Sequence, residues 1–433
     1  MKMPAMTNKQ TSADYAVTQS AQGKGLAITF VLCFLSIMFS GIASMLMSVY
    51  LTTVVRGLLG NVTGERMNTI TAYINSVFIF GMMFGGFAWG IICDKIGRSK
   101  AVVLSTALYG LCTVLTALSA SWFLVGICRF VTGFGAGGVL VTTNILVAEL
   151  WPAKKRAVAL GIVSAAMPVG FIAAGAMNVI LPDWHKACLT GIVPLVVAVV
   201  GFFVLPESAT WLQGITAQPY RPLQSVNLFS ATYKKNLLTG SLIFGAMLIG
   251  LWAIFAWAPT WIQDIGGNTA QPQGLGGLAM MDLAIFGLVG SVVSGWVVNA
   301  IGLRKTMMLC FVGCFLMTFV VFKLNTSVSA FTFIQMGILA IFFGISQGAL
   351  SVYIPALFPS VVRASATGFC FNIGRLFTAT VVFFIGALVT LLGGYGNAVF
   401  IFSFIFLGGL VVTFFSGNGQ QSESNIASAA FAE

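Results

Sequence analysis

Long apolar runs separated by short polar stretches repeat along the whole chain. About 20 apolar residues cross the ~30 Å hydrocarbon core of a bilayer as a helix, so this pattern predicts an all-α membrane protein with twelve transmembrane helices. The first six approximate spans are 25–52, 69–93, 101–119, 122–148, 157–180 and 187–205. The second six are 236–262, 276–298, 306–322, 327–354, 364–391 and 395–415.

Composition excludes a water-soluble domain. Of the 433 residues, 58% are hydrophobic and 7% are charged, whereas about a quarter are charged in an ordinary soluble domain. The eight cysteines lie in or beside apolar stretches and lack the spacing of metal ligands or of a disulfide scaffold. We therefore expect packing cysteines, with no metal and no cofactor.

The net charge of +11 fits a membrane topology better than a nucleic-acid partner. If the N-terminus is cytoplasmic, most of the 21 Lys and Arg residues fall in cytoplasmic segments, as the positive-inside rule requires. Twelve spans return the C-terminus to the same side. This distribution predicts a multi-pass protein of the cell inner membrane, in contact with lipid and with both termini cytoplasmic.

Polar stretches divide the chain into five parts. We expect a cytoplasmic N-terminal tail at 1–24, a six-helix bundle at 25–205, a cytoplasmic linker at 206–235, a second six-helix bundle at 236–415 and a disordered tail at 416–433. The linker is too short to form a domain of its own.

The two halves contain related sequences at corresponding places. Gly90, Asp94 and Gly97 follow the second span, and Gly295, Asn299 and Gly302 follow the eighth with the same spacing. Between spans four and five, Pro152 precedes Arg156 by four residues, and Pro359 precedes Arg363 equally between spans ten and eleven. Two such pairs indicate a duplication, hence two pseudo-symmetric six-helix bundles.

The first of these motifs resembles the signature of the major facilitator superfamily, G-x-x-x-D-[RK]-x-G-[RK]-x-[RK]. The fourth span adds Arg129, Gly133 and Gly135, which resemble the R-x-x-x-G-x-G motif of that family. The resemblance covers essentially all twelve spans. It implies two bundles that rock about a central substrate site and a cytoplasmic gate of helix-end charges that break apart as the bundles separate.

The resemblance and the loop charges together give the gate residues Gly90, Asp94, Gly97, Arg98, Glu149, Arg156 and Arg363. A simpler alternative for Asp94 and Arg98 is a tight turn with an acidic cap and a topology-fixing positive charge. Asn299 stands where the first half has Asp94, so an equivalent gate in the second half lacks a carboxylate and should be weaker.

Two strings imitate enzyme motifs. Residues 133–138 fit G-x-G-x-x-G but lie inside an apolar helix, where small residues let helices approach one another. Residues 344–348 fit a serine-hydrolase elbow, yet Ser346 lies within span ten and the single histidine, His185, is expected in an outer loop. We expect no enzyme.

Ionisable residues within spans are costly and indicate function by default. Arg375 falls near the middle of span eleven and shares a helical face with Asn372 and Thr378. A guanidinium presents forked donors that match a carboxylate, so this strip predicts a carboxylate-binding surface. The alternative is an arginine paired with backbone carbonyls at the bundle interface.

The residues around Arg375, from Phe358 onward, resemble symporters of the aromatic-acid and nicotinate type and organic-anion carriers, in which an arginine at this place accompanies anionic substrates. Residues 206–212 also resemble a string found in sugar porters. Residues 40–43 depart from the D-G-x-D of aromatic-acid carriers and contain neither carboxylate, so proton coupling by that route is excluded.

Asp282 and Arg129 are the candidate proton-coupling residues. Asp282 is the one carboxylate that enters a span deeply, and burial favours its neutral form. The Gly-rich start of span eight leaves the alternative that Asp282 begins a helix at the interface. For Arg129 the alternative is an arginine buried between helices that holds the geometry of its bundle.

Polar and aromatic residues of other spans complete the candidate substrate site. Aromatic rings can clamp a planar ligand, and amides can hydrogen-bond to it. The candidates are Tyr73, Asn75, Asn144, Trp257 and Gln347. Trp257 and Trp261 approach the outer interface, where tryptophan is common, so an anchoring role is the alternative for both.

Together these features predict a monomeric secondary active transporter that moves a small organic anion across the cytoplasmic membrane by alternating access, with a proton as co-substrate. A sugar porter and an exporter of amphipathic drugs are the alternatives. Two arginines against one deep carboxylate oppose a cationic cargo, and cavity amides for a sugar are sparse.

Overall fold

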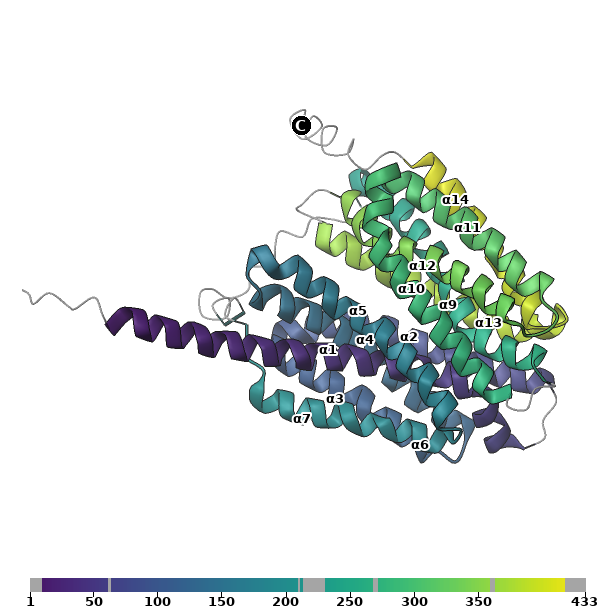
Figure 1. Ribbon diagram of the computed structural model, residues 1–433, viewed down its shortest axis with the longest axis horizontal. Helices are drawn as coiled ribbons and strands as arrows, with labels where there is room; N and C mark the ends of the chain where they lie inside the picture. Colours follow the sequence, from purple (N-terminus) through teal and green to yellow (C-terminus); the bar gives the residue numbers. More distant parts are fainter. Residues whose placement is uncertain are drawn as a thin grey trace, which may run out of the picture.

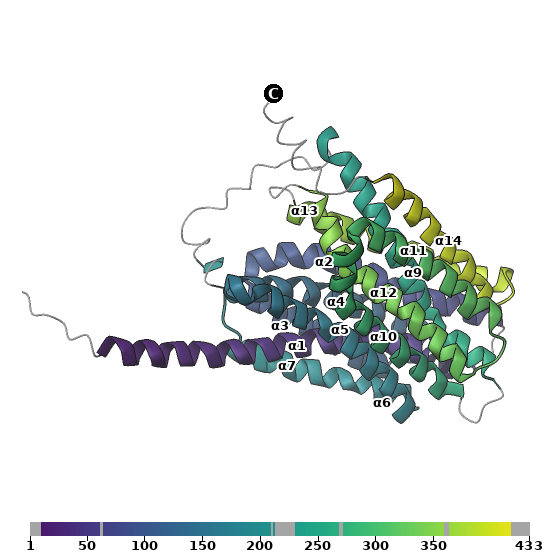
Figure 2. The ribbon, with the colours of Figure 1, turned by 45° about the horizontal axis from the view of Figure 1, so that its top comes forward.

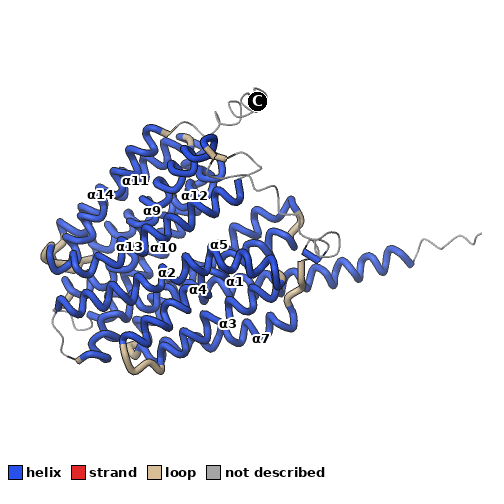
Figure 3. Tube along the Cα trace, turned by 180° about the vertical axis from the view of Figure 1, so that it is seen from behind, coloured by secondary structure: helices blue, strands red, loops and turns tan. Residues whose placement is uncertain are grey.

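The computed structural model describes residues 10–60, 64–208, 211–212, 230–267, 272–358 and 363–416, and these residues form helices and no strand (Figure 3). Within these ranges the description leaves out the side chains of residues 10–24, 64, 153–158, 231–232, 272–273, 363–365, 385–387 and 390. The predicted all-α fold is confirmed.

Helices of the first half form one group in Figure 1, coloured purple to teal. They are α1 (Gln10–Leu59), α2 (Gly64–Ile96), α3 (Arg98–Ala117), α4 (Trp122–Leu150), α5 (Ala153–Ile180), α6 (Trp184–Cys188), the 3₁₀ turn η1 (Leu189–Gly191) and α7 (Ile192–Val204). The short α6 and η1 continue into α7 as one membrane-length segment, Trp184–Val204.

Helices of the second half form the other group, coloured teal to yellow. They are α9 (Ala231–Ile265), α10 (Pro272–Ile301), α11 (Leu303–Leu324), α12 (Ala330–Ala356), α13 (Arg363–Leu391) and α14 (Tyr395–Phe415). The described residues therefore contain twelve helical segments long and apolar enough to cross a membrane, as the hydrophobic pattern predicts.

Several helices extend beyond their apolar runs. α1 ends at Leu59 and α2 begins at Gly64, whereas the apolar pattern predicts an end near 52 and a start near 69. Arg56 and Arg66, expected in a loop, lie in terminal turns of these helices. An apolar run indicates only the part of a helix that crosses the lipid. The helix itself can continue beyond that part, because its backbone hydrogen bonds do not depend on apolar side chains. α1 also begins at Gln10 and projects from the bundle (Figure 1).

Helix pairing repeats with an offset of six spans. In the first half α2 packs on α4, α3 on α7 and α1 on α5; in the second, α10 packs on α12, α11 on α14 and α9 on α13. The two halves meet chiefly through α2 with α13 and α5 with α10, which are equivalent pairs under the same offset. Figure 2 shows the two groups side by side. This symmetry confirms the predicted two-bundle architecture.

The molecule has two ends, which we name by their connections. The linker end carries the turns at 96–98, 150–153 and 301–303 and the residues that follow Val204. The far end carries the turns between α1 and α2, between α3 and α4, and between α9 and α10.

Glycines let α4 approach α2 closely. A Cβ on Gly133 would lie 2.1 Å from the carbonyl oxygen of Phe78, and one on Gly137 would lie 2.2 Å from that of Met82. These distances leave no room for a side chain. The string at 133–138 therefore packs helices, as the sequence predicts, and its resemblance to a nucleotide-binding loop has no structural basis.

Candidate functional site

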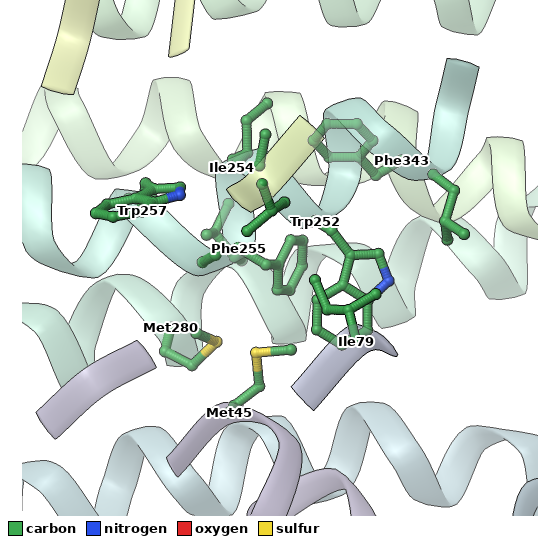
Figure 4. Packing of buried hydrophobic residues seen from close by; sticks show 14 of the residues in the cluster. Met45, Ile79, Trp252, Ile254, Phe255, Trp257, Met280 and Phe343 are labelled. Atoms are coloured by element: carbon green, nitrogen blue, oxygen red, sulfur yellow. The ribbon is translucent and has the colours of Figure 1, made fainter. Parts of the chain in front are cut away.

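An apolar layer crosses the interface between the two halves. The ring of Phe78 in α2 lies 6.4 Å from that of Trp252 in α9, and the ring of Phe171 in α5 lies 5.9 Å from that of Phe255. Figure 4 shows further members of this cluster, among them Met45, Ile79, Met280 and Phe343. Polar side chains at this interface are therefore surrounded by apolar side chains.

Arg375 lies where α13 meets α2, between the two halves. Its Nη1 donates a hydrogen bond to Oδ1 of Asn372 at 3.1 Å. A Cβ on Gly86 of α2 would lie 2.6 Å from that oxygen and 3.2 Å from Nη1, so the glycine makes room for the pair. Arg375 follows the first residue of α13 by twelve positions, about 18 Å along the axis.

The charge of Arg375 is not balanced by a carboxylate. The guanidinium is half-buried, and no acidic side chain that the structure describes forms an ion pair with it. Asn372 is 8% exposed and also donates to the carbonyl of Gly368, while Thr378 is fully buried and donates to the carbonyl of Gly374. The arrangement offers forked donors to an incoming anion.

The other predicted substrate contacts are distributed over several helices. Tyr73 of α2 stacks on Phe383 of α13, with ring centroids 4.7 Å apart, so it lies on the same helix junction as Arg375. Asn144 donates to the carbonyl of Leu140 in its own helix. Nδ2 of Asn75 and Nε2 of Gln347 are buried without a hydrogen-bond partner among the described residues.

Trp257 is deeply buried in this conformation. Its ring is fully buried and stacks on Tyr395 at 5.4 Å, within the second half. Trp261 is 3% exposed and packs on Phe322. In this conformation both rings are buried, and contact between Trp257 and a substrate stays a prediction.

Arg129 contacts the backbone of α1. Its Nη1 donates to the carbonyl of Ala43 at 2.6 Å and its Nη2 to that of Ser44 at 3.2 Å, while its Cζ lies 4.1 Å from the centroid of the Phe78 ring. The side chain is 3% exposed. This geometry matches the alternative of a buried arginine that holds its bundle together.

Asp282 lies well inside α10. The residues at 274–277 are helical, so Asp282 follows the first residue of α10 by ten positions, about 15 Å, and does not begin a helix. Its Oδ2 is buried and accepts no hydrogen bond from a described group. A charged carboxylate without a partner is costly in such a place, and protonation removes that cost.

Arg98 is the centre of a charged cluster at the linker end. Its Nη1 donates to Asp94 at 2.9 Å and its Nε to both carboxylate oxygens of Glu149 at 3.2 Å. The side chain of Arg98 is 14% exposed, against 59% for Asp94 and 23% for Glu149. These contacts join the ends of α2, α3 and α4 within the first half.

Glu207 and Trp211 join this cluster, and sequence reasoning did not assign them to it. The carboxylate of Glu207 accepts from the backbone N–H groups of Arg98 and Ser99, and the indole of Trp211 donates to the carbonyl of Asp94 at 2.9 Å. The sequence at 206–212 indicates a family resemblance, but the contacts of Glu207 and Trp211 with the α2–α3 turn are tertiary contacts without a local sequence signal.

The equivalent place in the second half has a different chemistry. Arg304 donates to the backbone carbonyls of Thr413 and Phe414 and has no carboxylate partner among the described side chains. Asn299 supplies no carboxylate at this place, and the weaker gate expected there stays a prediction.

The structure says little about the gate candidates Gly90, Arg156 and Arg363. A Cβ on Gly90 would meet nothing within 4 Å, so packing does not require glycine there. The side chains of Arg156 and Arg363 lie outside the described residues, although both positions fall in helices, α5 and α13.

The structure does not bring the serine of the hydrolase-like pattern and the histidine together. Ser346 is fully buried and donates to the carbonyl of Phe343 inside α12. His185 lies at the far end, beside the Asp183 carboxylate. The backbone N–H of His185 also donates to that carboxylate, which holds the pKa of Asp183 below its usual range.

Known proteins resemble this chain along most of its length. It is 26% identical to the cis,cis-muconate transport protein of Acinetobacter baylyi over 376 residues, 84% of this chain and 87% of that protein. It is also 26% identical to the 4-hydroxybenzoate transporter of Pseudomonas aeruginosa over 357 residues, 74% of this chain and 77% of that protein.

A solved structure shares the fold. The xylose transporter of E. coli in an inward-open conformation aligns with a TM-score of 0.75 at 15% identity, over 92% of this chain and 99% of that chain. A family model described as Major Facilitator Superfamily matches residues 26–380. With two bundles of six spans and this match, the chain belongs to the major facilitator superfamily of membrane transporters and is not an enzyme.

Proposed function

We propose that this protein moves a small organic anion across the membrane by alternating access, and that Arg375 binds the carboxylate. The observation that carries the proposal is the half-buried guanidinium of Arg375 at the α2–α13 junction, held by Asn372 and without a described acidic partner. Such a charge needs a counter-charge, and a carboxylate supplies it with matched geometry.

The relatives support an anionic cargo. Those reported above are named for transport of muconate and 4-hydroxybenzoate, both organic acids. Tyr73 and Phe383 stack at the same helix junction, but Phe383 follows Arg375 by eight positions of α13, about 12 Å, beyond the reach of a benzoate-sized acid bound at Arg375.

The orientation follows from charge. Lys95, Arg98 and Lys100 lie at the linker end, as do Arg304 and Lys305 in the second half. By the positive-inside rule this end faces the cytoplasm. The two relatives named above are bacterial, which supports the inner membrane as the location. Both bundles and the proposed anion site belong to one chain, and the functional unit that we propose is a monomer.

Asp282 is the proposed proton site. Its buried, unpartnered oxygen makes the neutral form favourable when the site is closed to water. A proton bound there would cross with the anion. Arg129 supports the geometry of the first bundle and takes no part in this step directly.

A ligand-stabilisation experiment tests the cargo class. The thermal unfolding midpoint of the purified protein is measured with increasing benzoate, muconate, xylose or tetraphenylphosphonium, each at constant ionic strength. A bound ligand stabilises by mass action, by about 2.7 kcal/mol at 100 times its dissociation constant. The proposal predicts a rise with a carboxylate alone. A rise with xylose or with the lipophilic cation, and none with either carboxylate, would contradict it.

A further inference from the structure

Neutral hydrogen bonds join the two halves at the far end. Oγ1 of Thr52 in α1 donates to Oε1 of Gln263 in α9 at 2.9 Å, and Nε2 of Gln263 donates to the carbonyl of Val49 at 3.5 Å. The hydroxyl of Tyr395 in α14 donates to Oδ1 of Asn68 in α2. Each bond links a helix of the first half with a helix of the second.

The two second-half residues are held firmly in place. The ring of Tyr395 stacks on the fully buried Trp257 at 5.4 Å. Gln263 packs so closely on α10 that a Cβ on Gly276 would lie 2.2 Å from its Nε2. Their polar groups are therefore presented to the first half from a rigid support.

A cavity of about 710 Å³ lies beside these bonds, and residues of both halves line it. Thr52, Asn68, Gln263 and Tyr395 are among its lining residues. Its charged residues, Arg56, Glu65 and Asp264, are exposed and form no ion pair with a described side chain. Hydroxyl and amide groups therefore connect the halves here, whereas the charged cluster around Arg98 joins helices within the first half.

The inner wall of the cavity contains an unsatisfied polar group. Thr260 lines the cavity, its side chain is 3% exposed, and its Oγ1 has no hydrogen-bond partner among the described residues. A buried hydroxyl without a partner costs free energy, which water or a ligand would recover if the halves separated here.

We propose that Gln263 and Tyr395 are the positioning residues of a latch that closes the transport path at the far end. Their bonds to Thr52, Val49 and Asn68 hold the halves together in the conformation described here. Breaking them widens the cavity down to Thr260 and admits ligand from the far end. The proposal rests on alternating access but not on the chemical nature of the cargo.

Cysteine labelling in detergent measures this opening without a substrate. Thr260→Cys places a thiol at a buried position and removes no hydrogen bond of the described structure. The eight native cysteines are all buried, and the parent protein without Thr260→Cys gives their background rate. The rate of maleimide labelling at position 260 then reports the open population.

Tyr395→Phe, Asn68→Leu and Gln263→Leu each remove latch bonds. Because a net hydrogen bond is worth about 1 kcal/mol, Tyr395→Phe and Asn68→Leu should each raise the labelling rate roughly five-fold. Gln263→Leu removes two bonds and should raise the rate by at least that factor. Tyr395→Phe combined with Asn68→Leu should label no faster than either single variant, since both remove the same bond. Retained helix content and elution volume show that each variant is folded.

Tyr50→Phe is the matched control. The hydroxyl of Tyr50 donates to the carbonyl of Leu181, also at the far end but within the first half. Its loss should leave labelling at the rate of the Thr260→Cys protein. The latch is refuted if the three latch variants label no faster than the Thr260→Cys protein, or if Tyr50→Phe accelerates labelling as much as they do.

Discussion

The carboxylate of Glu207 accepts a hydrogen bond from the backbone N–H of Arg98 at 2.8 Å, although 109 positions separate the two residues in the chain. It accepts another from Ser99 at 3.2 Å. The N-cap of α3, Gly97, has no side chain to satisfy these groups. The residue Glu207, which follows the first bundle, thus caps the helix that carries Arg98, the centre of the charged cluster at the linker end.

Gly97→Ala should destabilise the protein more than Gly302→Ala. Both glycines have positive φ, +107° and +85°, so alanine introduces backbone strain of about 1–3 kcal/mol at each. At Gly97 the new Cβ would also lie 2.4 Å from Oε2 of Glu207, whereas at Gly302 it meets nothing within 4 Å. Thermal unfolding of the two variants measures the difference.

Glu207→Ala in the Gly97→Ala background separates strain from collision. Glu207→Ala removes the carboxylate that the new methyl group meets. It should therefore lower the free energy of unfolding less in the Gly97→Ala protein than in the wild-type protein. Equal stabilities of the Gly97→Ala and Gly302→Ala variants would show that Glu207 does not pack as described.

Glu149→Gln should cost more stability than Asp94→Asn. The Glu149 carboxylate contacts Nε and Nη2 of Arg98, and its side chain is 23% exposed. The change to glutamine therefore weakens hydrogen bonds to a largely buried guanidinium and should lower the free energy of unfolding by about 1–2 kcal/mol. Asp94 is 59% exposed, and an ion pair in water contributes at most about 1 kcal/mol. Urea unfolding compares the two. The reverse order would make Asp94 the principal partner.

Arg129→Lys should be destabilising by about 1–3 kcal/mol. A lysine cannot reach the carbonyls of Ala43 and Ser44 together while covering the ring of Phe78. Ser44→Ala is the control, because it keeps the carbonyl that Arg129 contacts. If Arg129→Lys were as stable as the wild-type protein and yet lost pH-driven uptake, Arg129 would act in coupling and not in packing.

Asp282→Asn should retain substrate exchange and lose accumulation against a gradient. The amide imitates the protonated carboxyl permanently, so the cycle no longer responds to a pH difference. Counterflow and pH-driven uptake of the carboxylate identified by ligand stabilisation, measured in the same proteoliposomes, separate the two activities. Undiminished pH-driven accumulation would exclude Asp282 as the proton site.

Much of the fold follows from local sequence patterns. Twelve apolar runs give twelve spans because a bilayer requires a fixed length of apolar helix, and the repeated Pro–Arg and Gly spacings indicate the duplication. The helix ends were predicted less well, since Arg56 and Arg66 lie in turns that hydrophobicity does not mark.

The candidate site was predictable only in part. Arg375, Arg129 and Asp282 stand out because ionisable groups are rare in spans. Their partners do not stand out in the sequence. Arg129 donates to backbone carbonyl groups, and every residue has such a group whatever its side chain. Glu207 likewise resembles any linker carboxylate until the chain folds back onto Gly97.

The binding of a carboxylate to variants at two arginines tests the central claim most directly. Titration calorimetry compares wild-type protein, Arg375→Lys and Arg304→Lys with benzoate or muconate, whichever stabilises the wild-type protein. Lysine cannot offer forked donors, so Arg375→Lys should weaken binding at least ten-fold, equivalent to about 1.4 kcal/mol. Arg304 bonds to backbone at the linker end, and its lysine variant should bind as the wild type does. Unchanged affinity in Arg375→Lys would contradict the assignment of Arg375 as the anion-binding residue.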